Sequence, residues 1–150
     1  MKKMIALVLA LMMVLSLAAC GGNGGAQKGG KTVGIAMPTQ SSERWIKDGA
    51  NMKAQLEEKG YTVILQYAED DVQAQVSQIE NMISQKVDCL VIAAIDSGAL
   101  TGVEAQAKQA GIPIIAYDRL LMDTDAVSYY ASFDNEGVGR AIGEIGRAHV

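Results

Sequence analysis

An unbroken apolar run at residues 89–94, Cys-Leu-Val-Ile-Ala-Ala, most limits the folds open to this chain. A strand that faces water on one side alternates apolar and polar residues, whereas a strand covered on both faces can be apolar throughout. The run therefore predicts a central strand of a parallel sheet that has helices on both faces.

Strand-like and helix-like segments alternate on either side of this run. The other predicted strands are 32–37, 61–67, 112–117 and 127–133. The predicted helices are 42–59, one beginning at Asp70, 97–110, and one opened by 134–136. Apolar residues recur three or four positions apart within the helices, and Asp70 with Gln73 is expected to cap the second helix. The alternation predicts an α/β fold with a doubly wound parallel sheet, right-handed crossovers and strand order 2-1-3-4-5.

The N-terminal residues have the pattern of a lipoprotein signal peptide. Residues 1–19 carry Lys2 and Lys3 before a long apolar run, and Leu-Ala-Ala precedes Cys20. The alternative, a membrane anchor, is disfavoured because the run is shorter than the roughly 20 residues needed to span a bilayer. We expect cleavage before Cys20, lipidation of that cysteine, and a glycine-rich tether over 20–30.

Charge and cysteine content exclude some partners. The formal net charge is −4, and removal of the signal with its two lysines makes the mature chain more negative. An acidic chain disfavours nucleic acid and anionic membrane surfaces, so membrane association is expected only through the lipid. Cys89 opens an apolar run and is interpreted as a core residue rather than a disulfide partner.

The loops that follow the strands carry the candidate binding residues. In open α/β folds, ligands bind where the carboxyl ends of the strands meet. The candidates at that edge are Arg44, Trp45, Asp96, Asp118 and Arg119. Arginines and carboxylates hold hydroxyls through charge-assisted hydrogen bonds, and an aromatic face covers a sugar ring, so the set suits a neutral polyhydroxy ligand.

Several of these residues have structural alternatives. Trp45 can be core packing of the first helix, Asp118 and Arg119 can form a local ion pair, and Ser97 can cap the third helix. Asp96 and Asp118 could also form a hydrolase pair, but their separation cannot be derived from sequence. The glycine patterns of nicotinamide and Walker sites are absent from the sequence, and no metal or cofactor is expected.

The last six residues are interpreted as foreign to the gene. Residues 145–150 can be encoded by the start of a widely used sequencing-library adapter, so we expect the gene to continue beyond this point. His149, the only histidine, lies in this tail. Without it the chain lacks the commonest general base, which argues against an enzyme.

Six segments together resemble one known family. They are Val33–Thr39, Glu43–Trp45, Ser77–Ile83, Val91–Ala93, Ala116–Leu120 and Ser132–Asn135. They resemble the periplasmic-type sugar-binding proteins of ABC transporters, which have the ribose-binding-protein fold, and within them the xylose and multiple-sugar-binding group. The resemblance implies that 31–133 form the N-terminal lobe of a two-lobe type I periplasmic binding protein and that 134–144 begin the second. It also implies that Arg44, Trp45 and Asp96 line the sugar site, with Asp118 and Arg119 near the cleft.

The resemblance implies a function in transport. We expect an extracytoplasmic receptor, lipid-anchored to the cell membrane or periplasmic, that captures a monosaccharide and delivers it to ABC permease subunits. The alternatives are a sugar-sensing ectodomain that serves a membrane kinase or chemoreceptor, and a repressor with the same fold. The N-terminal signal disfavours the repressor. Because most of the second lobe is missing from the sequence, we expect these 150 residues alone to bind sugar weakly or not at all.

Overall fold

The computed structural model of the chain describes residues 30–148. The predicted signal peptide, the lipidation site at Cys20, nearly all of the predicted tether, and residues 149–150 lie outside the described residues. No helix among residues 30–148 is both long and apolar enough to cross a bilayer.

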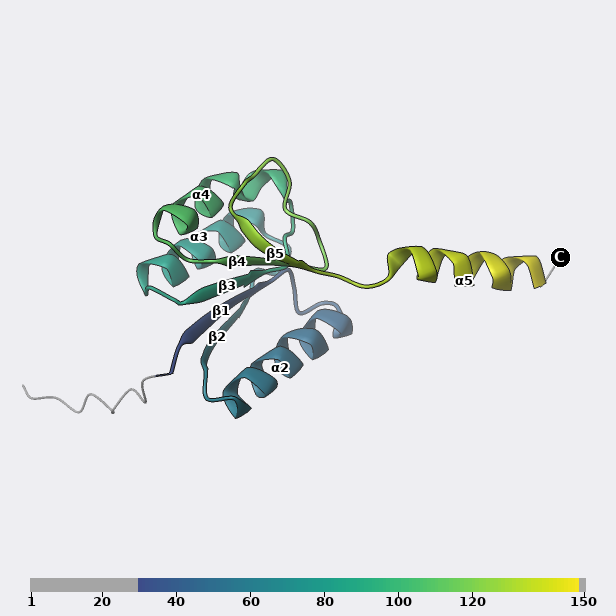
Figure 1. Cartoon of the computed structure of the whole chain (residues 1–150), viewed down its shortest axis with the longest axis horizontal. Helices are drawn as coiled ribbons and strands as arrows, with labels where there is room; N and C mark the ends of the chain where they lie inside the picture. The colour runs from purple at the N-terminus through teal and green to yellow at the C-terminus, as the bar shows by residue number, and fades with distance from the viewer. Residues whose placement is uncertain (1–29, 149–150) are drawn as a thin grey trace, which may run out of the picture.

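Five parallel strands form one sheet in the order β2-β1-β3-β4-β5, which confirms the predicted topology (Figure 1). The strands are β1 Thr32–Met37, β2 Thr62–Tyr67, β3 Cys89–Ile92, β4 Ile114–Tyr117 and β5 Val127–Ala131. The third, fourth and fifth strands are shorter than the sequence predicts. The register between β4 and β5 shifts at Ile114/Ile115.

Helices cover both faces of the sheet. They are α2 Glu43–Glu58, α3 Val72–Ser84, the 3₁₀ turn η2 Gly98–Leu100 with α4 Thr101–Gln109, and α5 Asn135–Ala148. In Figure 1, α3 and α4 lie on one face and α2 lies on the other, while α5 extends away from the sheet. The expected helix over 97–110 is thus a 3₁₀ turn followed by a shorter α-helix.

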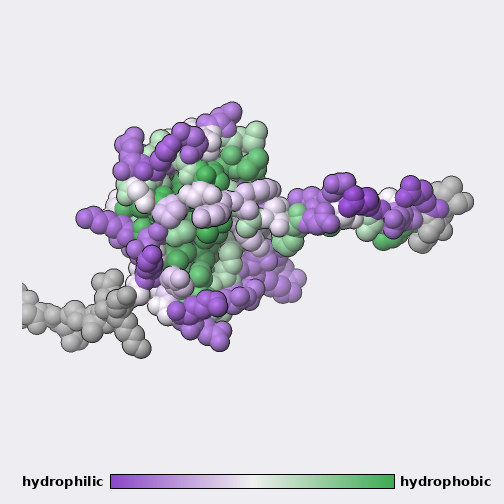
Figure 2. Space-filling view, viewed as in Figure 1, coloured by the Kyte–Doolittle hydropathy of each residue, from purple (hydrophilic) through white to green (hydrophobic). Residues whose placement is uncertain are grey.

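Alternate residues of β3 enter two separate cores. Leu90 and Ile92 are fully buried on the α3 and α4 side, whereas Val91 and Ala93 are buried on the α2 side. This is the two-sided burial that the apolar run predicts. Figure 2 shows apolar side chains between the polar outer surfaces of the two helical layers.

The predicted cap of the second helix is wrong by one residue. The N-cap of α3 is Asp71, whose Oδ1 accepts hydrogen bonds from the backbone N–H groups of Gln73 at 2.8 Å and Ala74 at 3.0 Å. Asp70 instead has a left-handed backbone with φ of 61°. An N-cap residue needs an extended backbone, which Asp71 has with φ of −94° and ψ of 112°. The capping box with Gln73 is therefore not formed.

Helix α4 buries a carboxylic acid. The side chain of Glu104 has no exposed surface, and it lies on the same helix face as the core residues Val103 and Ala107. Burial raises the pKa of Glu104, and the nearby hydroxyl of Thr124 opposes this with a smaller effect. Folding therefore favours the protonated acid.

We predict that Glu104→Gln weakens the dependence of stability on pH. A raised folded-state pKa means that the native state loses stability as pH rises above the pKa of an unfolded glutamate. The neutral glutamine has nearly the same shape but does not titrate. Urea unfolding at pH 5 and pH 8 should show the variant gaining stability relative to the wild type at the higher pH. If variant and wild type differed by the same free energy of unfolding at both pH values, the burial of an ionisable acid here would be contradicted.

Candidate functional site

The loops at the carboxyl edge of the sheet bring four of the five predicted site residues into contact. Arg44 and Trp45 stand in the first turn of α2, after the β1 loop, and Asp118 and Arg119 follow β4. Arg44 forms an ion pair with Asp118, 74 positions away in sequence. The guanidinium carbon of Arg119 lies 5.3 Å from the centroid of the Trp45 ring.

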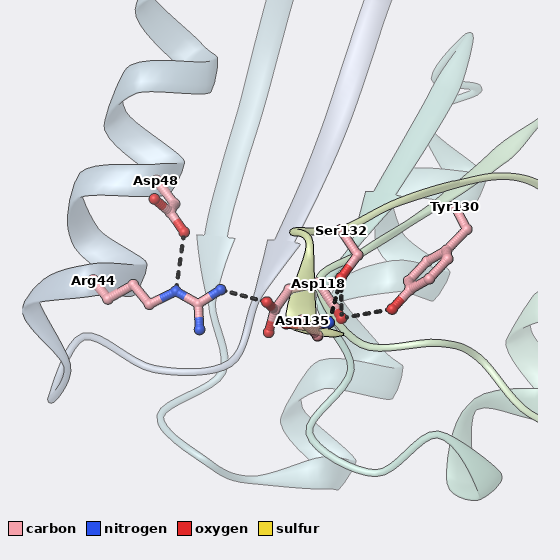
Figure 3. A network of polar contacts seen from close by, with 6 residues as sticks. All are labelled: Arg44, Asp48, Asp118, Tyr130, Ser132 and Asn135. Atoms are coloured by element: carbon pink, nitrogen blue, oxygen red, sulfur yellow. Dashed lines mark hydrogen bonds and ion pairs between the residues drawn. The ribbon is translucent and has the colours of Figure 1, made fainter. Parts of the chain in front are cut away.

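Arg44 is the centre of this cluster. Figure 3 shows its side chain between Asp48 on the same helix and Asp118 on the β4 loop. Its Nε lies 3.6 Å from Asp48 Oδ2. Its guanidinium carbon lies 4.6 Å from the ring centroid of Trp45 and 5.1 Å from that of Phe133. The hydrogen bond to Asp118 raises the pKa of Arg44, so the group stays a cation.

Trp45 packs in the core and also lies against the two arginines of the edge. The residue is only 6% exposed and belongs to the core cluster under α2, which is the structural alternative. Arg44 and Arg119 nevertheless both lie within cation–π distance of the indole. Trp45 thus anchors the helix and supports the two cations at the edge.

Asp118 ties the ends of two strands together. Its backbone is left-handed, with φ of 63°, and its N–H donates to Ala131 O at 2.7 Å. Its carbonyl accepts the hydroxyl of Tyr130 at 3.0 Å and that of Ser132 at 3.4 Å, which Figure 3 also shows. The turn therefore presents the Asp118 carboxylate to Arg44 from a fixed backbone.

The alternative of a local ion pair between Asp118 and Arg119 is wrong. Asp118 pairs with Arg44, and Arg119 Nη1 donates to the backbone carbonyl of Ala94 at 2.7 Å. A left-handed turn at Asp118 separates the directions of neighbouring side chains. Arg119 thereby connects the β4 loop to the loop after β3.

Asp96 lies at the same edge but contacts none of the other four site residues through a hydrogen bond or ion pair that the structure shows. Its Oδ1 accepts the N–H groups of Gly98 at 2.9 Å and Ala99 at 3.3 Å. Ser97, the alternative cap, makes no side-chain capping bond, and Asp96 instead caps the turn that begins the third helical segment. Both of these hydrogen bonds are accepted by Oδ1 of Asp96.

Asp134 caps the first turn of α5. Its Oδ1 accepts the N–H of Gly137 at 2.9 Å, in the first turn of α5. Asn135 Nδ2 donates to Ser132 Oγ at 3.3 Å. These two residues support the exit from β5.

Sequence reasoning missed three residues that support this edge of the sheet. Asp48 stands four positions after Arg44 on α2, a spacing that could have identified it as a partner. Phe133 was not among the candidate residues, yet its ring contacts Arg44. Gln75 is fully buried beneath the β3 loop, four positions before Ile79 on the apolar face of α3. A polar glutamine on the apolar face of this helix was the signal that could have identified it.

The arrangement gathers cationic, anionic and aromatic groups at one edge of the sheet. It offers guanidinium donors, carboxylate acceptors and the aromatic rings of Trp45 and Phe133 around one edge. Among residues 30–148, no group of three or more histidine, cysteine, aspartate or glutamate residues could hold a metal ion. Neutral hydroxyls, which donate and accept, match such a set.

Comparison with known proteins identifies the family of this chain. The family described as periplasmic binding protein domain matches residues 33–149. The chain belongs to the periplasmic binding protein family. Members of this family are binding proteins rather than enzymes. The five-stranded sheet of this chain is that of one lobe of a type I periplasmic binding protein, as the sequence predicted.

Three similar proteins illustrate the match. The multiple sugar-binding periplasmic protein SbpA of Azospirillum brasilense is 57% identical over 108 residues, which are 72% of this chain and 30% of SbpA. The D-xylose-binding periplasmic protein of Escherichia coli is 43% identical over 71% of this chain and 32% of its own length. The crystal structure of an ABC transporter solute binding protein from Clostridium phytofermentans with bound β-D-glucose is 60% identical, with a TM-score of 0.75 over 77% of this chain and 36% of that one.

The periplasmic binding protein chain described here spans about a third of the length of these relatives. The matched part contains every predicted sugar-site residue from Arg44 to Arg119.

The fluorescence of Trp45 should report directly on this edge, because Trp45 is the only tryptophan of the chain. We predict that Arg44→Ala shifts the emission maximum to longer wavelength, since removal of the guanidinium uncovers one face of the indole to water. The matched control is Arg140→Ala, which removes an exposed arginine that pairs with Glu136 on α5. Equal emission maxima for both variants would contradict the contact between Arg44 and Trp45.

Proposed function

We propose that this chain supplies one wall of the sugar site of a lipid-anchored extracytoplasmic receptor that delivers a monosaccharide to an ABC permease. The observation that carries the proposal is the fixed position of Arg44, which two carboxylates and two aromatic rings hold at the ligand-binding edge. The names of the relatives support a pentose or hexose of the xylose or glucose type as the ligand.

Each group at the edge has a defined part in this proposal. Arg44 and Arg119 donate hydrogen bonds to sugar hydroxyls, Asp118 and Asp96 accept them, and the rim of Trp45 covers the apolar side of the ring. Because Arg44 is already held in place, little side-chain entropy is lost when the sugar binds.

The proposed mechanism is closure of two lobes without any covalent step. A sugar bound at this edge meets the opposing lobe, and its contacts favour the closed state, which docks on the permease. Lipidation of Cys20 would keep the receptor at the membrane; it rests on the sequence pattern alone, because Cys20 lies outside the described residues. Residues 134–144 are proposed to begin the opposing lobe.

The test begins with the gene. Sequencing of clean genomic DNA across the locus should show a reading frame that replaces 145–150 and continues into a second lobe. The same DNA gives the neighbouring genes: a permease and an ATPase would support transport, whereas a membrane kinase or chemoreceptor in their place would favour the sensing alternative.

We predict that the mature full-length protein binds D-glucose or D-xylose in calorimetry and that the 150-residue chain binds them far more weakly. In the full-length protein, Arg44→Ala should weaken affinity about tenfold to a hundredfold, as expected for loss of charged hydrogen bonds. Lys47→Ala is the matched control, because it removes a more exposed cation of the same helix, which pairs with Glu43. Unchanged affinity in the Arg44 variant would remove Arg44 from the site.

A further inference from the structure

The backbone directly before Asp96 is held in place by a buried side chain. Strand β3 ends at Ile92, and its last ladder bond runs from Ala93 N–H to Ala36 O at 3.0 Å. Beyond that point the chain leaves the sheet, so its peptide groups lose their strand partners. Buried peptide groups without partners are costly, and another group has to satisfy them.

Gln75 on α3 satisfies two of these peptide groups at once. Its Nε2 donates to the carbonyl of Ala93 at 3.0 Å, and its Oε1 accepts the N–H of Ile95 at 2.9 Å. The Gln75 side chain has no exposed surface, although it stands on a helix whose other buried residues are Ile79 and Met82. The side-chain amide of Gln75 thus binds the backbone at both ends of the segment directly before Asp96.

The peptide group between the two that Gln75 binds is held by a second side chain. The carbonyl of Ala94 accepts Arg119 Nη1 at 2.7 Å. Three successive backbone positions, 93, 94 and 95, are therefore fixed by two side chains from different elements. Asp96 follows immediately, and its Oδ1 is fixed in turn by the N–H groups of Gly98 and Ala99.

We propose that Gln75 is a positioning residue of the sugar site, which fixes the turn at 93–95 and so aims the Asp96 carboxylate at the ligand. This inference rests on the proposed sugar-binding function. Gln75 itself touches no ligand in the proposal, because it is sealed beneath the loop. Its contribution to affinity passes through Asp96.

A matched control is present on the same helix. Gln78 Nε2 donates to the carbonyl of Tyr67 at 2.9 Å, at the end of β2. Gln78 therefore has the same side chain and a similar role for a strand end, but its bond lies under a different loop. Gln75→Met and Gln78→Met each remove amide hydrogen bonds while nearly keeping side-chain volume.

Amide hydrogen exchange on the full-length protein tests the positioning independently of sugar. Gln75→Met should speed exchange at Ile95, Gly98 and Ala99, whereas Gln78→Met should leave these three amides unchanged. Unchanged exchange in the Gln75 variant would overturn the proposal. Should Gln75→Met not fold, Gln75→Asn serves instead, because its amide is one methylene too short to keep both bonds.

A double-mutant cycle with Asp96→Ala tests the effect on binding. We expect Gln75→Met to weaken sugar affinity about tenfold in the wild type and less than about twofold in the Asp96→Ala background, since coupled residues are non-additive. Gln78→Met should keep affinity within about twofold in either background. Additive losses from Gln75→Met and Asp96→Ala, or full affinity in the Gln75 variant, would overturn the proposal.

The two hypotheses fail in different ways. If the wild-type protein binds no sugar, the proposed function is wrong, and so is Gln75 as a residue of a sugar site. The exchange rates at Ile95, Gly98 and Ala99 then still show whether Gln75 fixes the turn. If the wild type binds sugar but the exchange rates or the cycle fail, only the proposal for Gln75 is lost.

Discussion

Burial of β3 between two helical layers is the constraint on which the other features depend. Leu90 and Ile92 pack under α3 and α4, while Val91 and Ala93 pack under α2. A strand buried on both faces cannot slip by one residue without exchanging the two cores. The register with β1 and β4 is therefore fixed, and so is the point at which each strand ends.

The carboxyl edge of the sheet is rigid because these strand ends are fixed. In a parallel sheet the chain leaves every strand at the same edge. Beyond the strand ends, side chains from other elements hold the backbone. Gln75 and Arg119 hold the loop after β3, and Tyr130 and Ser132 hold the turn at Asp118. Interactions of this kind turn irregular loops into a surface whose groups need little rearrangement to bind a ligand.

The sequence predicted the fold more fully than it predicted the site. The positions of the strands and helices follow from local patterns, because each carries its own periodicity, and the apolar run at 89–94 favours a parallel sheet. The order 2-1-3-4-5 is a common one for doubly wound sheets. The cap of α3 was misplaced because Asp70 and Asp71 are chemically identical neighbours. Only the backbone distinguishes them, since Asp71 is extended and Asp70 is left-handed.

The errors within the site have a different cause, which is distance along the chain. Arg44 and Asp118 are 74 positions apart, and no local pattern pairs them. Gln75 acts on a backbone 18 and 20 positions away, so its role follows from how α3 packs on the sheet. Composition and position at the carboxyl edge nevertheless identified Arg44, Trp45, Asp118 and Arg119, which the structure brings together.

Helix α5 has a consequence for the fate of the chain in a cell. Val138 and Ile142 stand one turn apart on this helix and are 53% and 64% exposed. Apolar side chains that share a helix face and meet water are the surfaces that chaperones and quality-control proteases bind. As long as this face of α5 stays uncovered, it favours association between copies of the chain.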